Sequence, residues 1–136
     1  MKEIHELFNE AGKLHGHYCP GLAIGVRAGY EAQRILQCDC ESGRDLYCIY
    51  EKAACWLDGI QWVFKATLGK GSMIYKPLDT PGFNFYDAVS GKSIRLLYKS
   101  PKTELSRPEL AEYILTAPIE ELYEVGEVKF PCPTRN

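Results

Sequence analysis

The stretch HGHYCPGLAIGVRAGYEAQRIL, residues 15–36, indicates how the N-terminal part of this chain folds. Pro20 suits the first position of a helix, where its missing N–H costs nothing, and we expect that helix to cover residues 20–36. Glycine is a poor helix former, about 1 kcal/mol per residue worse than alanine. Nevertheless, one stripe of the helix consists of small residues: Gly21, Gly25, Gly29 and Ala32. The stripe predicts that another backbone packs very close to this face, and we expect a dimer interface there.

Hydrophobic spacing on either side of this helix predicts further elements. We expect helices over residues 4–13, 53–64 and 107–116, the last opened by a capping box at Ser106 and Glu109, and one more helical turn at 119–122. Expected strands cover residues 45–51, 72–75, 83–89, 93–98 and 123–130, with the three between 72 and 98 forming an antiparallel meander. Helices grouped at the start and strands in the middle predict an α+β fold, in which N-terminal helices pack on a mostly antiparallel sheet in a single domain over residues 1–136.

Charge and composition exclude several classes of function. The chain has 16 Lys and Arg against 18 Asp and Glu, a net charge of -2, which argues against binding nucleic acid through phosphate neutralisation. Its apolar runs are far shorter than the roughly 18–20 residues that cross a bilayer. Residues 1–17 carry charges every few positions and lack the apolar core of a secretory signal. We therefore expect a cytoplasmic protein without membrane insertion, whose six cysteines are reduced.

The strongest local feature is the motif His15-x-His17-x-Cys19. Imidazole nitrogen and thiolate sulfur are both good ligands for a borderline metal such as zinc. Cys19 stands at or beside the N-cap of the expected helix, where amide N–H groups and the helix dipole favour a thiolate over a thiol. The alternative is a tight glycine turn whose histidines face solvent, but a helix-capping cysteine beside two histidines favours a metal.

A second pair of candidates lies in the helix expected over residues 53–64. Cys55 falls in its first turn, so that two cysteines at two helix N-termini, with one or two histidines, could close a tetrahedral site. The alternative for Cys55 is a buried small hydrophobic side chain. Asp58 lies three residues further on the same face, where it could orient a histidine ligand or act as a general base. The alternative for Asp58 is a carboxylate on the helix surface.

The remaining candidates carry weaker signals. Lys70, in a glycine-rich turn, could bind an anionic substrate group near the metal or simply be solvated. Cys38 and Cys40 form a C-x-C pair without the partner pair that a metal site would need, and with Cys48 they indicate local packing or a redox-sensitive edge. Cys132 has no partner motif.

Four segments of the chain resemble, in order, the FmdE family, which takes its name from a component of formylmethanofuran dehydrogenase. They are HGHYCPGLAIG at residues 15–25, ACWLDGIQ at 54–61, TLGKG at 67–71 and SGKSIR at 90–95. The first segment is quite specific, and the ordered set is more so. The resemblance implies an α+β core and a homodimer.

The same resemblance implies a divalent metal, most often zinc, with Ni2+ and Fe2+ as alternatives. The ligands would come from the first segment and from the cysteine of the second: His15, His17, Cys19 and Cys55. It also implies Asp58 and Lys70 as catalytic residues and Thr67 as a cofactor-binding residue. Two departures stand out. Ala66 occupies a position where relatives often carry a cysteine, and only Cys132 lies in the C-terminal stretch, so that we expect the core domain without the family's zinc-finger module.

Three functions compete at this point. The first is a metal-binding core protein that holds a small ligand or substrate at an accessible His/Cys site, related to one-carbon metabolism of the formylmethanofuran type. The second is a non-enzymatic accessory or metal-delivery subunit that docks on a molybdenum or tungsten oxidoreductase, with its metal shell closed by four protein ligands. The third is a thiol redox or sensor protein that uses Cys38, Cys40 and Cys48. Whether the chain is an enzyme is left open by the residues.

Overall fold

Two helices, α2 (Pro20–Leu36) and α3 (Trp56–Phe64), cross closely in the computed structural model, which describes residues 2–38, 41–101 and 104–133. The bounds of α2 are those predicted. A Cβ added to Gly25 would lie 2.0 Å from the carbonyl oxygen of Trp56, and one added to Gly59 would lie 2.7 Å from the amide nitrogen of Val26. The close backbone packing is therefore confirmed. The expected partner was wrong, because α3 of the same chain covers the stripe of small residues.

The sheet contains five strands in the described residues, in the order β2-β1-β3-β4-β5. They are β1 (Leu46–Tyr50), β2 (Met73–Tyr75), β3 (Gly82–Asp87), β4 (Ser93–Tyr98) and β5 (Tyr123–Gly126). Three of the four pairings are antiparallel, which confirms the mostly antiparallel sheet.

The predicted meander over residues 72–98 is wrong at its first strand. β2 pairs in parallel with β1 and not with β3, and β1 lies between those two strands. A parallel pair needs a crossover connection, and α3 provides it. This arrangement ties α3, and Cys55 at its start, to the edge of the sheet.

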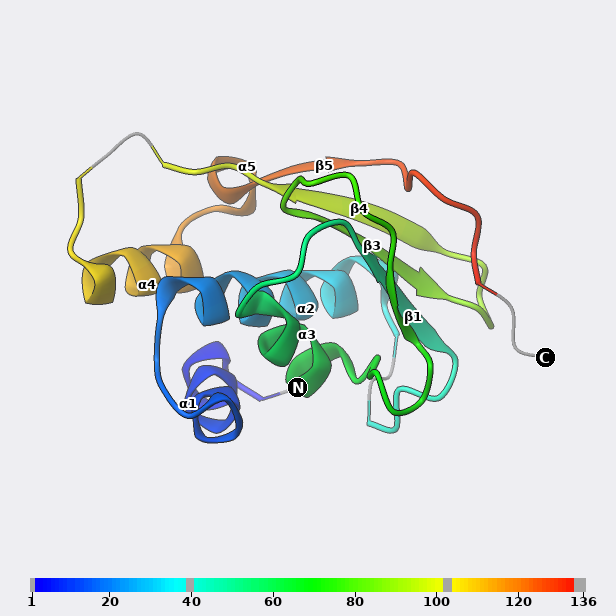
Figure 1. Ribbon diagram of the computed structural model, residues 1–136, viewed down its shortest axis with the longest axis horizontal. Coiled ribbons are helices and arrows are strands. Elements are labelled where there is room, and N and C mark those ends of the chain that lie inside the picture. Colours follow the sequence, from blue (N-terminus) through cyan, green and yellow to red (C-terminus); the bar gives the residue numbers. More distant parts are fainter. Residues whose placement is uncertain (1, 39–40, 102–103, 134–136) are drawn as a thin grey trace.

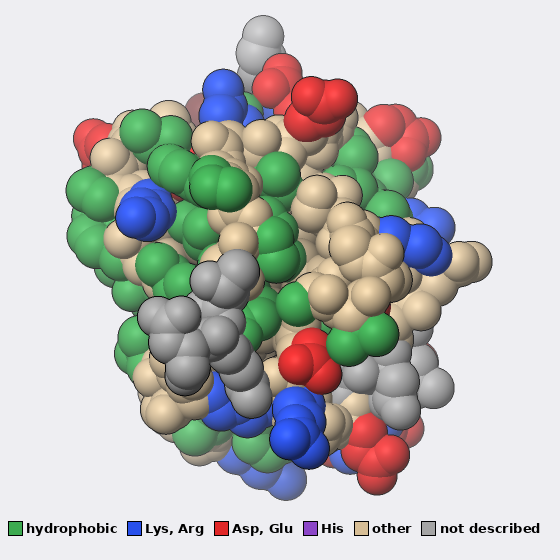
Figure 2. Space-filling view, turned by 90° about the vertical axis from the view of Figure 1, so that its right-hand side faces the viewer, with side chains coloured by type: hydrophobic (Ala, Val, Ile, Leu, Met, Phe, Trp, Pro, Cys, Tyr) green, Lys and Arg blue, Asp and Glu red, His purple; other side chains and the backbone are tan. Residues whose placement is uncertain are grey.

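The hydrophobic core lies between the helices and one face of the sheet (Figure 1). Phe64 of α3 meets Phe85 of β3 edge to face, with 4.8 Å between ring centroids. The opposite face buries Tyr47, Ile49 and Tyr86 beneath the segment that follows β5, and the hydroxyl of Tyr86 donates to the carbonyl oxygen of Phe130 at 2.7 Å. Figure 2 shows this end of the molecule, where hydrophobic side chains gather along one side.

The other helices flank α2 and α3. α1 (Ile4–His15) packs on both, and the indole of Trp62 donates to Glu10 of α1 at 3.0 Å. α4 (Arg107–Thr116) begins with the predicted capping box and packs on α2, while α5 (Ile119–Leu122) is a single turn before β5. None of the described helices has both the length and the apolar character that crossing a bilayer requires.

Candidate metal centre

Cys19 is the N-cap residue of α2, as predicted. Its backbone is extended, and its sulfur accepts a hydrogen bond from the amide N–H of Leu22 at 3.4 Å. Pro20 follows at the first helical position. The side chain is buried, with 4% of the residue exposed. An N–H donor and the positive end of the helix dipole both favour the thiolate form of a cysteine at this position.

Cys55 stands at the N-cap position of α3, one residue ahead of the first turn in which it was expected. Its backbone is already helical and its sulfur makes no capping bond to α3, so the sulfur points away from its own helix toward α2. Gly21 allows this approach. A Cβ at Gly21 would lie 3.1 Å from the Cβ of Cys55 and 3.9 Å from the sulfurs of both Cys19 and Cys55.

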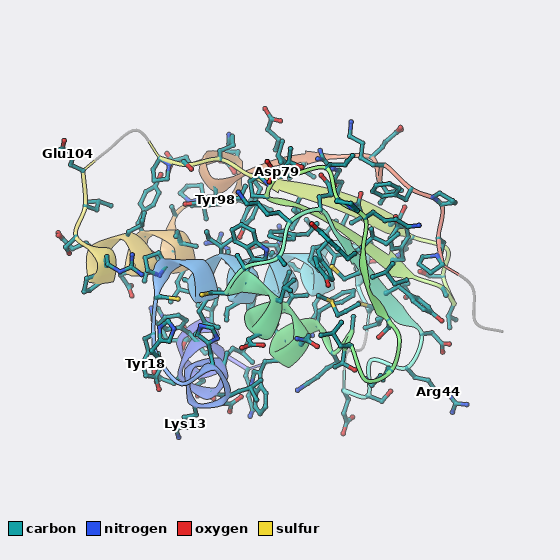
Figure 3. The ribbon with its side chains drawn as sticks, in the orientation of Figure 1. Lys13, Tyr18, Arg44, Asp79, Tyr98 and Glu104 are labelled. Carbon is teal, nitrogen blue, oxygen red and sulfur yellow. The ribbon has the colours of Figure 1, made fainter. Side chains whose placement is uncertain are left out.

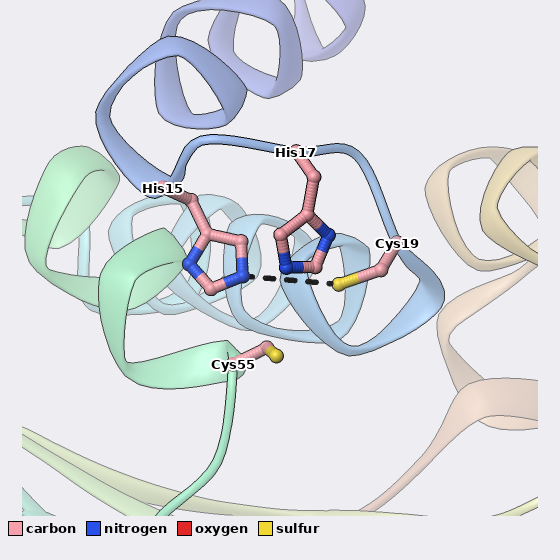
Figure 4. Close-up of side chains that lie close together, drawn as sticks. All are labelled: His15, His17, Cys19 and Cys55. Carbon is pink, nitrogen blue, oxygen red and sulfur yellow. Dashed lines mark hydrogen bonds between the residues drawn. The ribbon is translucent and has the colours of Figure 1, made fainter.

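The loop between α1 and α2 contributes both histidines. α1 ends at Gly16, whose φ of 95° is the left-handed conformation that glycine adopts without strain. The chain then returns along the start of α2, so that His15 and His17 lie with their ring centroids 4.4 Å apart. His15 is largely buried and its Nε2 lies 4.0 Å from the sulfur of Cys19 (Figure 4). His17 is exposed.

Asp58, in the first turn of α3, reaches the far side of the His15 ring. The Nδ1–H of His15 donates to the Asp58 carboxylate at 2.7 Å. Because Nδ1 is occupied by this bond, Nε2 is the ring nitrogen that is available as a ligand, and it is the one that faces Cys19. A histidine held by a carboxylate in this way is typical of metal ligands.

These four side chains, called the His/Cys group below, form a set that could hold a metal ion. One ligand atom from each of His15, His17, Cys19 and Cys55 lies within 4.8 Å of the others. In a tetrahedral zinc site, with Zn–S near 2.3 Å and Zn–N near 2.0–2.1 Å, ligand atoms are about 3.3–3.8 Å apart. The His/Cys group therefore has the donor types and nearly the spacing of such a site before any ion draws the ligands together.

The electrostatics of the His/Cys group also suit a cation. Burial raises the pKa of the Cys55 thiol, and the neighbouring Cys19 and then Asp58 raise it further. Two sulfurs and a carboxylate gathered without a positive charge hold Cys55 in its protonated form. A divalent cation bound between the sulfurs would reverse this effect, because a coordinating thiol loses its proton.

Thr67 and Lys70 lie beyond the opposite end of α3. The ammonium of Lys70 donates to the carbonyl oxygens of Ser42 at 2.5 Å and Lys65 at 2.7 Å, and the hydroxyl of Thr67 accepts from the backbone N–H of Lys70. A nine-residue helix, about 13 Å long, separates this turn from Cys55. The structure thus brings Asp58 to the His/Cys group and leaves Thr67 and Lys70 away from it.

A cavity of about 240 Å³ lies between α1 and α4, next to the histidine loop. Tyr18, between His17 and Cys19 in the chain, forms part of its wall together with Phe8, and the two rings meet edge to face (Figure 3). His5 and Glu112 form another part, with Nε2 of His5 3.0 Å from a Glu112 oxygen. This cavity was not predicted, because nothing in the spacing of its lining residues links α1 to α4.

The other cysteines are not brought to the His/Cys group. Cys48 is buried in the middle of β1, where burial first and the charge of Glu51 second raise the pKa of its thiol. Such a thiol is poorly placed for exchange chemistry, which weakens the redox alternative. Cys38 is half-buried after α2, Cys132 is exposed, and Cys40 lies outside the described residues.

Fold and candidate site together define a small α+β protein with two histidines and two cysteines gathered at the start of two crossing helices. The family model described as "FmdE, Molybdenum formylmethanofuran dehydrogenase operon" matches residues 14–124. The chain therefore belongs to the FmdE family, and the resemblance noted in the sequence is confirmed.

Two similar proteins support this assignment to different degrees. A protein of Archaeoglobus fulgidus named "Probable S-adenosyl-L-methionine-binding protein" is 31% identical over 100 residues, which are 71% of this chain but only 27% of that protein's length. The crystal structure of an FmdE-like protein of tungsten formylmethanofuran dehydrogenase type from Syntrophus aciditrophicus has a TM-score of 0.67 and 20% identity, over 93% of this chain and 72% of that chain. At that identity, the second likeness concerns the fold.

Proposed function

We propose that the protein binds one zinc-like divalent ion through the His/Cys group. The convergence of one ligand atom from each of His15, His17, Cys19 and Cys55 to within 4.8 Å carries this proposal. Two thiolates and two imidazoles suit zinc best among common cellular metals, with nickel(II) and iron(II) as weaker competitors. When bound, the ion would supply Lewis acidity, which polarises a carbonyl or acidifies water.

The residues around the His/Cys group have separate tasks in this proposal. Asp58 holds the Nδ1 proton of His15 and presents Nε2 to the ion. The start of α2 stabilises Cys19 as a thiolate through the N–H of Leu22. Gly21 leaves the space in which the sulfur of Cys55 meets that of Cys19. Asp58 is thus a positioning residue.

The wider role that we propose is that of a metal protein whose ion takes a small ligand, within one-carbon chemistry of the formylmethanofuran type. The family description supports that chemistry, and the exposure of His17 supports access to the ion. This chain spans only 27% of the archaeal relative, so the ligand in that relative's name gives no support to a ligand here. A homodimer stays a proposal that the family resemblance alone supports.

An accessory subunit of an oxidoreductase is the second candidate, and the family's association with a dehydrogenase operon favours it. In that role the ion would be closed off by four protein ligands. The two candidates differ in whether an outside molecule can reach the ion.

Elemental analysis of untagged protein tests metal binding directly. Metal content would be measured after purification and after reconstitution of the apoprotein with zinc alone, for the wild type and for Cys55→Ala and His15→Ala. We expect one ion per wild-type chain and loss of that ion in both variants. Cys132→Ala and His5→Ala are the matched controls, because both residues lie outside the His/Cys group, and they should keep the ion. Unchanged metal content in Cys55→Ala and His15→Ala would overturn the proposal.

A further inference from the structure

We infer that His17 is the exchangeable member of the His/Cys group and that a neutral nitrogen donor from outside the protein can take its place. This inference rests on the proposed function, since it assigns different duties to the four ligands of that ion. It also decides between an accessible ion and a closed one.

Three of the four ligands are held by the protein itself. His15 is largely buried and bonded to Asp58 at 2.7 Å. Cys19 is buried and capped by the N–H of Leu22 at 3.4 Å. Cys55 is half-buried and lies against Gly21, on a helix that is packed backbone to backbone on α2. Moving any of these three would disturb α2 or α3.

His17 has no comparable support. It stands in the short loop between α1 and α2, on the exposed side of the group. Within the part of the chain that the structure describes, its ring contacts the ring of His15 at 4.4 Å and takes part in no hydrogen bond. Only the ion would hold this ring in place, so that His17 can turn toward solvent without breaking a contact of the core.

The charge of the site selects the class of replacement ligand. Two thiolates already neutralise a divalent ion, and the carboxylate of Asp58 lies beside the group with a further negative charge. An added anion would leave negative charge uncompensated in a partly buried site, which is unfavourable. A neutral nitrogen base preserves both the charge and the ligand type that His17 provides, and it suits a borderline metal.

Histidine NMR on the zinc-loaded wild type tests the exchange, with imidazole as the probe. The chain has three histidines, so their ring 15N signals are readily assigned with single variants. We expect added imidazole to return the His17 signals to those of the apoprotein while the His15 signals stay at their zinc-bound positions. Zinc content is measured on the same samples and should stay at one ion per chain. His17 signals that do not move, or release of both rings together, would overturn the inference.

The variants His17→Ala and His15→Ala provide an independent comparison, read by stoichiometry and by the visible spectrum of the cobalt-substituted protein. We expect His17→Ala to keep the metal and to change its cobalt spectrum in a saturable way when imidazole is added, whereas His15→Ala should lose the metal. Loss of metal from His17→Ala alone would contradict the inference and leave the proposed function standing. A wild type that binds no metal would remove the proposed function itself.

Discussion

The carboxylate of Asp58 accepts a hydrogen bond from Nδ1 of His15 at 2.7 Å, across the gap between the start of α3 and the end of α1. The bond fixes which nitrogen of His15 faces the sulfur of Cys19. It also joins a residue of the first family segment to a residue of the second. The orientation of a ligand on one helix is thereby set by the first turn of another.

Asp58→Asn should weaken metal binding without unfolding the protein. The amide cannot match the charge-assisted bond of the carboxylate, and loss of such a partner commonly lowers metal affinity about 10–100-fold. The measurement is a competition titration of zinc against a chromophoric chelator, with the far-ultraviolet circular dichroism spectrum as a check on folding.

The control for this variant is Asp79→Asn, which makes the same change of charge at an exposed carboxylate, 3.8 Å from Lys52. Its zinc affinity should equal that of the wild type. Equal affinities for both variants would show that the bond between Asp58 and His15 does not tune the site.

Gly25→Leu should destabilise the chain and disturb the His/Cys group at the same time. A Cβ at this position would lie 2.0 Å from the carbonyl oxygen of Trp56, the residue after Cys55. Because backbone cannot move as a side chain does, α3 must shift, and overpacking of this kind costs about 1–3 kcal/mol or more. Urea unfolding measures the loss in free energy, and zinc content measures the displacement of Cys55.

Gly69→Leu is the comparison for the glycine variant, since a Cβ at Gly69 meets nothing within 4 Å. It should leave both the urea midpoint and the zinc content close to wild type. Light scattering on Gly25→Leu adds a further check. Because α3 of the same chain covers this glycine, we expect the assembly state of folded protein to stay unchanged.

The sequence was informative where local physics determines structure. The spacing of Pro20 and the apolar residues after it predicted the full extent of α2, and capping chemistry placed Cys19 and Ser106 at helix starts. The pairing of strands was less accessible. β2 was assigned to a meander because it follows β1 at a distance in the chain, and no local pattern shows that α3 makes a parallel crossover between them.

The candidate site shows the same division. The motif from His15 to Cys19 and the start of the helix near Cys55 predicted four side chains that the fold does gather. The position of Lys70 was not predictable in this way, because its ammonium binds carbonyl oxygens of two segments that are distant in sequence, at Ser42 and Lys65. The stripe of glycines predicted close packing correctly but could not say whether the second backbone belonged to the same chain.

Lys70→Met should lower stability slightly and leave metal binding unchanged. The ammonium secures the turn after α3 through its bonds to Ser42 and Lys65, and loss of such exposed bonds costs about 0.5–1.5 kcal/mol. The unfolding midpoint in urea and the zinc affinity of the same preparation provide the two readings. A fall in zinc affinity at unchanged stability would instead place Lys70 in contact with the metal site.

His5→Gln should reveal a pH-dependent tie between α1 and α4. The two ring nitrogens of His5 lie 2.7 Å from a Glu3 oxygen and 3.0 Å from a Glu112 oxygen. These carboxylates, Glu3 first and then Glu112, raise the pKa of His5 above its ordinary value of 6.5. A raised pKa in the folded state contributes stability that is fully present below pH 6.5 and is lost as the pH rises through the folded value.

The expected difference in unfolding free energy between wild type and His5→Gln is therefore larger near pH 5.5 than near pH 8.5. It should stay within about 0.2–1 kcal/mol, because the ion pairs are exposed to solvent and salt. Denaturant unfolding of both apoproteins at the two pH values gives this difference, and titration of the His/Cys group cancels from it because both proteins carry that group. Glu112→Gln should remove part of the rise in the His5 pKa, read from the ring proton shifts by NMR. A difference between wild type and His5→Gln that is the same at both pH values would mean that His5 joins α1 to α4 through packing and not through charge.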